Sequence, residues 1–451
     1  MKWRSLIQVV VGLVFLSTIL LAEETPPTRE KTAPLTGDKP SIYKDYCMPR
    51  GNPAGTGVVA NPAWKGPKGP EIVEKWTLLL EKGDGSKNWP ASIIVDEKFY
   101  ISFGGNLHCV DTKTQKVLWQ RAGRIGNPVI VADTLYIAQL KCLVAEEVES
   151  GKMVWQFEAP EYPCQRTGKS APQVTPLVTE EYVFFSPSDS HLYTKQPPFY
   201  ALDRKTGKVV WEFSYVNGFS SNPVFGLDMV YVALHATGPK GFEMAERVWK
   251  GQNDACLLAL DSKTGKEKWR LKIGGTIIGL VLDQERKMLY GVGHRDRLVF
   301  VDALTGEKKA EVRPEQKGSR KRFNSDTVTL WKDYCLFAGY GEPLHGVDVD
   351  AQKDAWTFES NNKFGCYMAH CTADGLVYLG DEWHDPGTKM FAVEIDTGKE
   401  VWSFNPSCAV GRNPSDYRML GCWPIVWKGV LYYVDTSCVL RAIGDKEAKA
   451  K

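Results

Sequence analysis

The stretch Ala201-Leu-Asp-Arg-Lys-Thr-Gly-Lys-Val-Val-Trp211 is written repeatedly along this chain. Two further copies keep its pattern closely, ALDSKTGKEKW at Ala259–Trp269 and AVEIDTGKEVW at Ala392–Trp402. Looser copies are found at Cys109–Trp119, Ala145–Trp155, Phe300–Ala310 and Gly346–Trp356. Self-similarity of this kind indicates a repeat fold, in which each unit needs its neighbours to bury its apolar face.

Each copy is predicted to form a strand, a tight turn and a second strand. Gly207 permits the positive φ that the turn requires, and the side chains of Asp203 and Thr206 can bond the backbone of the turn. Trp211 ends the copy with a large apolar face to pack on a neighbouring unit and an N–H to donate. The last positions of successive copies are 36 to 58 residues apart. Several short strands in each such unit predict a β-propeller.

The two ends of the chain indicate the number of blades. Residues 421–444 supply three strands and stop before any tryptophan strand, whereas Glu71–Leu80 supplies one strand, with Trp76, and no partner before it. Together they complete an eighth blade, and closing the ring removes open sheet edges. We therefore predict an all-β protein, an eight-bladed β-propeller over residues 43–444 closed by N- and C-terminal strands in one blade, followed by a charged tail at 445–451.

The N-terminus has the pattern of an export signal. Lys2 and Arg4 precede an apolar run at Leu6–Leu21, and Ala22 suits a cleavage site, so residues 1–22 are predicted to be a signal peptide. The alternative is an uncleaved anchor, but the run is shorter than the roughly 20 residues that span a bilayer. Residues 23–42 are polar and rich in Pro and Thr, which predicts a disordered leader. We expect an exported protein, periplasmic or extracellular, with no membrane span after cleavage.

Composition and cysteine content narrow the possible partners and cofactors. The 451 residues carry a formal net charge of +2, so no global field favours nucleic acid. Eleven cysteines in an exported chain suggest disulfides, with at least one thiol left over. The predicted pairs are Cys366–Cys371 and Cys408–Cys422. No Cys-x-x-Cys-His sequence indicates covalent haem, and no Cys-x-x-Cys pairs indicate structural zinc.

The repeated Ala-x-Asp-x-x-Thr-Gly-Lys-x-x-Trp pattern resembles the tryptophan-docking motif of PQQ-like (quinoprotein alcohol dehydrogenase-like) propellers, over nearly the whole mature chain. The segment Asp45–Gly57 also resembles the Arg-Gly-Asn-x-x-x-Thr-Gly lead-in of many exported bacterial members. That family includes quinone-dependent dehydrogenases and non-catalytic scaffolds such as the outer-membrane protein assembly lipoprotein. Ala310 in place of tryptophan, and Gln115 and Gln352 in place of the turn glycine, depart from the motif and are expected to weaken single blades only.

The resemblance implies that the Thr-Gly turns lie on one face and the longer connections on the other. In this chain those longer connections carry the irregular loops, so we expect function on that loop face. The ligand-binding candidates there are Trp89, Arg124, Arg166, Arg322, Arg412 and Trp423. The metal candidates are Asp381, Glu382, His384 and Asp385, a set of oxygen ligands and one imidazole that could suit Ca²⁺ or a transition ion. The alternative is that long surface loops are simply polar.

Two functions are compatible with these features. The first is a non-catalytic exported propeller that binds a protein, glycan or small ligand of the cell envelope. The alternative is a PQQ- and Ca-dependent quinoprotein dehydrogenase that oxidises an alcohol or sugar. The enzymes of this family typically have an adjacent cysteine pair and a calcium-binding set, and neither stands out here, which favours the scaffold and no catalytic residues. No Gly-x-Ser-x-Gly or His-Glu-x-x-His sequence supports a hydrolase.

Overall fold

A computed structural model describes residues 43, 51–55, 65–81, 92–103, 106–122, 125–139, 142–160, 175–187, 198–214, 220–234, 255–293, 297–314, 327–338, 343–360, 366–381, 389–406, 423–435 and 438–447. They fall within the unit Ile42–Lys451 and form eight four-stranded antiparallel sheets. No helix in these ranges is long and apolar enough to cross a membrane. The predicted signal peptide and leader lie outside the described residues.

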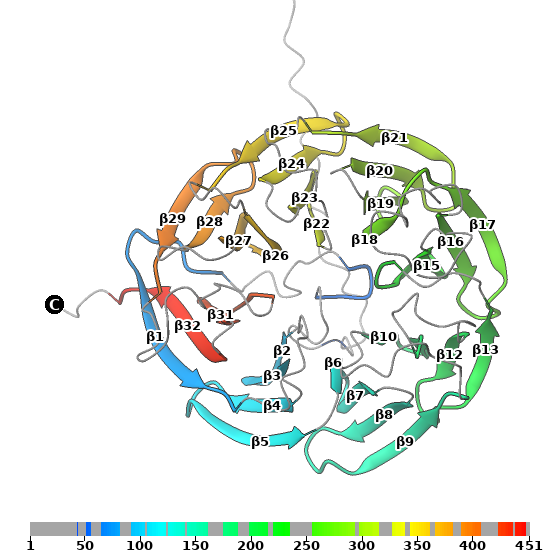
Figure 1. The fold of residues 1–451 in the computed structure, drawn as a ribbon, viewed down its shortest axis with the longest axis horizontal. Helices are drawn as coiled ribbons and strands as arrows, with labels where there is room; N and C mark the ends of the chain where they lie inside the picture. Colours follow the sequence, from blue (N-terminus) through cyan, green and yellow to red (C-terminus); the bar gives the residue numbers. More distant parts are fainter. Residues whose placement is uncertain are drawn as a thin grey trace, which may run out of the picture. The chain divides into compact units, whose positions relative to one another are not determined.

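Seven of the sheets are each built from four consecutive strands, and together they surround a common axis (Figure 1). Blades 1 to 3 comprise β2 (Ser92–Val95), β3 (Lys98–Phe103), β4 (Asn106–Asp111) and β5 (Lys116–Ala122); β6 (Ile125–Val131), β7 (Thr134–Gln139), β8 (Cys142–Glu147) and β9 (Met153–Glu158); and β10 (Leu177–Val178), β11 (Tyr182–Phe185), β12 (Phe199–Asp203) and β13 (Val209–Phe213). Blades 4 and 5 comprise β14 (Val224–Gly226), β15 (Met229–Leu234), β16 (Cys256–Asp261) and β17 (Glu267–Lys272); and β18 (Ile277–Asp283), β19 (Met288–Gly293), β20 (Arg297–Asp302) and β21 (Lys308–Val312). Blades 6 and 7 comprise β22 (Val328–Trp331), β23 (Tyr334–Ala338), β24 (Leu344–Asp348) and β25 (Lys353–Phe358); and β26 (Cys366–Ala373), β27 (Leu376–Asp381), β28 (Met390–Glu394) and β29 (Glu400–Phe404).

The eighth blade joins the two ends of the chain. Its strands are β30 (Ile425–Trp427), β31 (Val430–Val434), β32 (Val439–Asp445) and, on the outside, β1 (Ile72–Leu79), which lies antiparallel to β32 in Figure 1. The buried Arg441 of β32 pairs with Asp435 at 2.9 Å and with Glu74 of β1. This confirms the predicted eight-bladed propeller closed by strands from both termini.

The apolar core lies between neighbouring blades, and the outer strand of each blade faces solvent. Every residue of β15 is buried, whereas in β13 only Trp211 is buried and its neighbours along the strand are exposed or half-buried. Inner strands therefore read as continuous apolar runs, as strands buried on both faces do. Outer strands are more polar, and each has a free edge.

Tryptophan side chains interlock successive blades. Trp211 of blade 3 donates its Nε1–H to the Ser262 carbonyl in the turn of blade 4, at 2.8 Å. Its ring covers Gly265, which has a φ of +69°, and a Cβ added to that glycine would lie 2.6 Å from the ring. The same donation links Trp155 to Arg204 (2.9 Å), Trp269 to Ala303 (2.9 Å) and Trp356 to Ile395 (2.7 Å). The turn glycine is thus required by both its backbone conformation and the ring above it.

A turn assembled from both chain ends receives the last tryptophan. The closing blade has no hairpin between its third and outer strands, because these come from opposite ends of the chain. Trp402 instead donates to the Pro67 carbonyl at 2.7 Å and packs on Gly69. The Asp445 carboxylate accepts the backbone N–H groups of Lys68 (3.0 Å) and Gly69 (2.8 Å), as the aspartate of an intact Asp-x-x-Thr-Gly turn does. The split turn completes the ring.

Blade 5 keeps an aromatic side chain in spite of Ala310. Phe300 lies opposite Ala310, whereas in the intact copies an alanine lies opposite the tryptophan. The large and the small residue have therefore exchanged strands, and the Phe300 ring packs edge-on against Tyr290 at 5.1 Å. Because no tryptophan ring projects toward the turn of blade 6, Gln352 can stand at the glycine position there, with a φ of +53°.

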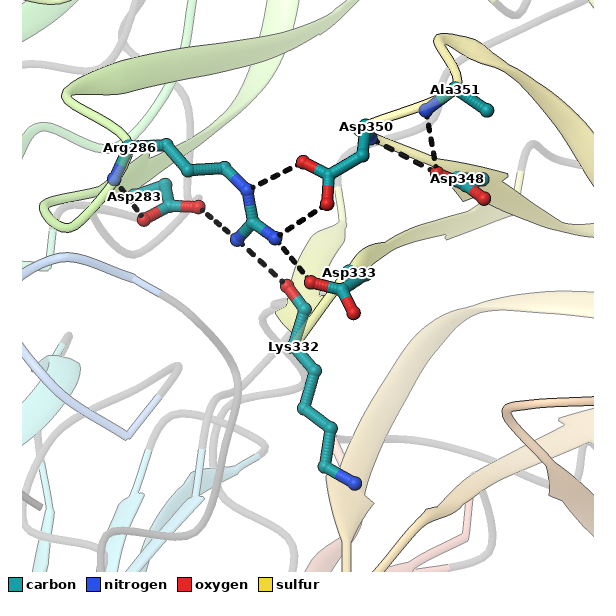
Figure 2. A network of polar contacts seen from close by, with 7 residues as sticks. All are labelled: Asp283, Arg286, Lys332, Asp333, Asp348, Asp350 and Ala351. Atoms are coloured by element: carbon teal, nitrogen blue, oxygen red, sulfur yellow. Dashed lines mark hydrogen bonds and ion pairs between the residues drawn. The ribbon is translucent and has the colours of Figure 1, made fainter. Parts of the chain in front are cut away.

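An ionic link joins blades 5 and 6 at this junction (Figure 2). Arg286, in the turn between β18 and β19, contacts Asp283 of its own turn at 2.9 Å. It also reaches into blade 6, to Asp350 at 3.0 Å, to Asp333 and to the Lys332 carbonyl. Burial disfavours the charge, but the hydrogen bonds to Asp350 and Asp283 outweigh it, so the pKa of Arg286 is raised. The Arg286 guanidinium, bonded to carboxylates of both blades, therefore links blades 5 and 6 at the junction where no tryptophan docks.

The predicted Cys366–Cys371 disulfide is wrong. Cys371 is a buried free thiol. Both cysteines lie in β26, where their partners on β27 are Asp381 and Tyr378. Those partners are three residues apart, about 10 Å along a strand, which exceeds the Cα separation of about 7 Å that a disulfide can bridge. The predicted pair Cys408–Cys422 lies outside the described residues.

Candidate functional site

A segment of the lead-in lies inside the ring on the side of the Thr-Gly turns. Phe225 of β14 donates its backbone N–H to the Pro53 carbonyl at 2.8 Å, and Leu282 of β18 donates to the Ala54 carbonyl at 3.0 Å. Figure 1 shows this blue segment, Gly51–Gly55, inside the ring of inner strands. Phe225 and Leu282 stand near the ends of their strands, just before turns on the Thr-Gly side. The chain's own backbone therefore occupies part of the axis on that side.

Polar residues mark the opposite ends of the inner strands. Each inner strand begins where the outer strand of the previous blade ends, which is the loop face. The residues at or near these starts are Ser92, Asn127, Thr175, Thr276 and Thr327, which we call the axial polar set. Asn127 donates to the Thr175 hydroxyl at 2.8 Å between blades 2 and 3, and Ser92 donates to the Trp423 carbonyl at 2.9 Å between blades 1 and 8. These bonds fix the spacing of the strands that carry the loops.

Two further buried polar residues lie beside this set. The imidazole Nε2 of His370 in β26 is 3.1 Å from the Thr329 hydroxyl of β22, which links blades 7 and 6. Arg297, at the start of β20, is 6% exposed and donates to the Gly275 carbonyl at 2.9 Å, with the Glu311 carboxylate 4.0 Å away. Hydroxyls, an amide and one buried guanidinium at or near strand starts, with an imidazole further along β26, can position a polar or anionic ligand by hydrogen bonding.

Sequence reasoning did not single out the axial polar set, His370 or Arg297. A signal was available, because each stands in or next to a strand whose other residues are largely apolar. A polar residue at such a position must find a partner when it is buried. The repeat motif drew attention to the opposite end of each blade instead.

Among the predicted ligand-binding residues, the structure describes Trp423. It precedes β30, is half-buried, and packs against the apolar core of the closing blade, while its carbonyl receives the Ser92 hydroxyl. The other five, Trp89, Arg124, Arg166, Arg322 and Arg412, lie outside the described residues. A binding role for all six stays a prediction.

The predicted metal cluster is described only at its edge. Asp381 is the last residue of β27, and Glu382, His384 and Asp385 lie outside the described ranges. Within those ranges, no group of three or more His, Cys, Asp or Glu side chains could hold a metal ion. The metal site therefore also stays a prediction.

Comparison with known proteins places this architecture among its relatives. Residues 149–404, more than half of the chain, match the family model described as outer membrane protein assembly factor BamB. The chain is also 28% identical to the polyvinylalcohol dehydrogenase of Sphingopyxis sp. (strain 113P3) over 404 residues, 74% of this chain and 55% of that protein. It thus spans about half the length of this curated relative.

Two solved structures share the fold. BamB from Moraxella catarrhalis aligns with a TM-score of 0.56 at 15% identity, over 84% of this chain and 100% of that one. The quinohemoprotein alcohol dehydrogenase from Comamonas testosteroni aligns with a TM-score of 0.64 at 15% identity, over 90% of this chain and 82% of that one. At such identity the likeness shows the fold alone. Together with the family match over residues 149–404 and the eight four-stranded blades, this likeness shows that the chain belongs to the PQQ-like β-propeller family of outer membrane protein assembly factor BamB.

Proposed function

We propose that this protein is an exported, non-catalytic scaffold that binds an envelope partner on its loop face. The observation that carries the proposal is the family match, which runs from the turn before β9 to the end of β29 and so includes most of the ring. The family description is that of an assembly factor. The basic, apolar and small residues at positions 1–22 support export.

The geometry of the axis supports the choice of face. Backbone of Gly51–Gly55 occupies the Thr-Gly side, where it bonds β14 and β18. The other side carries the axial polar set and the longer connections, and cross-blade bonds hold the strand starts beneath them. A rigid ring that presents irregular loops is the usual way in which a scaffolded fold builds a binding surface.

A matched pair of variants tests this face. In the first variant, four predicted loop-face arginines are changed to serine: Arg124, Arg166, Arg322 and Arg412. In the control, four lysines of turns on the Thr-Gly side of the ring are changed to serine: Lys205, Lys263, Lys332 and Lys428. Both remove four positive charges, so a general charge effect would appear in both. Crosslinking of wild type in the envelope fraction should give a specific partner band. The loop-face variant should lose this band and the control should keep it, and equal retention in both variants would contradict the proposal.

The second candidate is a PQQ- and Ca-dependent dehydrogenase, favoured by the identity with a polyvinylalcohol dehydrogenase over 74% of the chain. The axial polar set fits the ion poorly, because it consists of hydroxyls and one amide whereas Ca²⁺ sites are rich in carboxylate oxygens. The test is to add PQQ and Ca²⁺ to the mature protein and to follow dye-linked oxidation of alcohols and sugars. If neither oxidation nor a bound-quinone absorbance is observed, this candidate is ruled out.

A further inference from the structure

β21 and β25, the outer strands of blades 5 and 6, lie at the periphery of the ring (Figure 1), and a cleft of about 530 Å³ lies between them. Its lining includes Val312 and Pro314 from blade 5 and Asp354 and Thr357 from blade 6. Ala310, at the repeat position of the docked tryptophans, shares a face of β21 with Val312. The cleft thus lies at the junction where no tryptophan docks, and its size is that of a small-molecule site.

The blade 6 wall of the cleft holds three polar side chains in contact. The Thr357 hydroxyl is 3.4 Å from Nδ1 of His345 and 3.3 Å from Oδ2 of Asp354, and that oxygen lies 3.8 Å from Nδ1. His345 is 2% exposed and shares a face of β24 with Val347, which packs in one apolar cluster with Val312 of blade 5. The imidazole therefore faces the junction between the two blades.

The fold does not require an imidazole at this position. In blades 2 to 5 and in blade 7, the residue at the register position of His345 is aliphatic or aromatic. These residues are Val144, Tyr200, Leu258, Val299 and Phe391. The polar wall is therefore a particular feature of the junction between blades 5 and 6 and not a requirement of the repeat.

Blade 1 departs from the repeat in the same way but bridges its junction with protein. It has Gln115 at the turn glycine, as blade 6 has Gln352, and His108 at the equivalent register position. Beside it, Gln120 donates its side-chain amide at 2.7 Å to Glu81, which follows β1 of the closing blade. A donor thus meets a carboxylate across the junction of blades 8 and 1. At the junction of blades 5 and 6 the Asp354 carboxylate is present, and no described residue of blade 5 donates to it.

Asp354 is the acidic group of the cleft with acceptor capacity to spare. One of its oxygens accepts the 3.3 Å bond from Thr357, and the other has no hydrogen-bond partner among the described residues. Across the cleft, the Glu311 carboxylate is already bonded by Lys308 and Arg313. Because an ionised carboxylate is a strong acceptor with several sites, Asp354 favours a ligand that brings a charged donor. Its side chain is 29% exposed, so a ligand in the cleft can reach it.

The rest of the lining defines the rest of the ligand. Lys353 is exposed, and no described carboxylate lies within ion-pair distance of its ammonium group. Val312 and Pro314 are buried and add apolar surface to the lining. We propose that this cleft binds a small zwitterion of the amino acid class, with its ammonium group on Asp354, its carboxylate on Lys353 and a short alkyl chain on the apolar surface. The site is separate from the loop-face partner, because it lies between outer strands.

Three probes of matched shape test the charges of the ligand. L-Leucine carries both charged groups, 3-methylbutylamine only the ammonium group and 4-methylpentanoate only the carboxylate. Isothermal titration calorimetry of the mature protein should give a dissociation constant of about 1 mM or lower for leucine and one about tenfold higher for 3-methylbutylamine. 4-Methylpentanoate should not bind. Absence of binding by both ammonium probes at about 50 mM would overturn the proposal, and so would a carboxylate probe that binds as tightly as leucine.

Matched variants assign the binding to this cleft. Asp354→Asn should weaken leucine and 3-methylbutylamine about tenfold or more, because it removes the charge from the acceptor. Lys353→Met should weaken leucine about tenfold and leave 3-methylbutylamine unchanged. The control Glu400→Gln changes the register counterpart of Asp354 in blade 7, where Trp356 docks, and should alter neither constant. All variants should keep the thermal transition of wild type. Equal affinity of Asp354→Asn and wild type would place the binding elsewhere on the protein and equally overturn the proposal.

Discussion

The junction between blades 3 and 4 and the junction between blades 5 and 6 are held by different chemistry. At the first, the Trp211 ring is 8% exposed, covers a glycine and makes one hydrogen bond to Ser262. At the second, the Arg286 guanidinium bonds carboxylates from two blades (Figure 2). The first is an apolar contact that salt does not screen, and the second depends on charge. One repeat position can be lost because charged residues elsewhere link the same two blades.

The largest effect is expected from Trp211→Ala. Removing the buried ring should lower the free energy of unfolding by about 3–5 kcal/mol, and it leaves the Ser262 carbonyl without its donor. Trp211→Phe keeps most of the apolar area and should cost less. Guanidinium unfolding measures both. A cost below about 1 kcal/mol for Trp211→Ala would mean that the ring does not hold the blades together.

The glycine beneath the ring gives the next largest effect. Gly265 and Gly151 have φ values of +69° and +66°, so alanine at either should cost about 1 kcal/mol in backbone strain. A Cβ at Gly265 would also lie 2.6 Å from Trp211, whereas nothing lies within 4 Å of one at Gly151. Gly265→Ala should therefore cost about 1–3 kcal/mol more than Gly151→Ala. Equal losses would show that the ring moves aside freely.

Arg286→Gln tests the ionic junction. The Arg286 side chain is 18% exposed but Asp333 and Asp350 are 55% and 57% exposed, so the loss should be about 1–2 kcal/mol, less than for a fully buried pair. Unfolding should be compared at low salt and at about 1 M salt, where the Debye length is near 3 Å. The difference from wild type should shrink at high salt, while that of Trp211→Ala should not. If salt changes the stability losses of Arg286→Gln and Trp211→Ala alike, the junction between blades 5 and 6 depends on charge no more than the junction between blades 3 and 4.

The repeat carried enough information to predict the blades but not the connections that complete them. Seven copies of a local pattern predicted the strands, the turns and the tryptophans, since each depends on residues a few positions apart. The split turn joins Pro67 and Gly69 to residues more than three hundred positions away. Arg286 of blade 5 bonds Asp350 of blade 6, which is 64 positions away. Neither has a local spacing that a single sequence can reveal.

The candidate site was harder to predict than the fold for a related reason. The polar residues of the inner strands, such as Asn127 and His370, come from different blades and share no motif. Only the closed ring brings them to one face. The aspartates and arginines of the loops were visible in the sequence, but a loop composition does not determine where a side chain lies.

The smallest effect concerns the turn that receives Trp211. Hydrogen bonds from Lys268 and Thr264 lower the pKa of Asp261 to about 2, against an ordinary value near 3.9. Because the folded pKa lies below the unfolded one, this contribution is complete above about pH 4 and is lost as the pH falls toward about 2. The Asp261 side chain is 24% exposed and lies at the protein surface, so solvent screening should keep the contribution well under 1 kcal/mol. In Lys268→Met, NMR titration should move the pKa of Asp261 back toward its ordinary value, whereas the indole N–H resonance of Trp211 should stay in place, because the ring bonds the backbone of Ser262 and not the carboxylate. A shift of that resonance with the carboxylate's titration would show that the turn charge and the docked ring are coupled, and that even the apolar junction depends on charge.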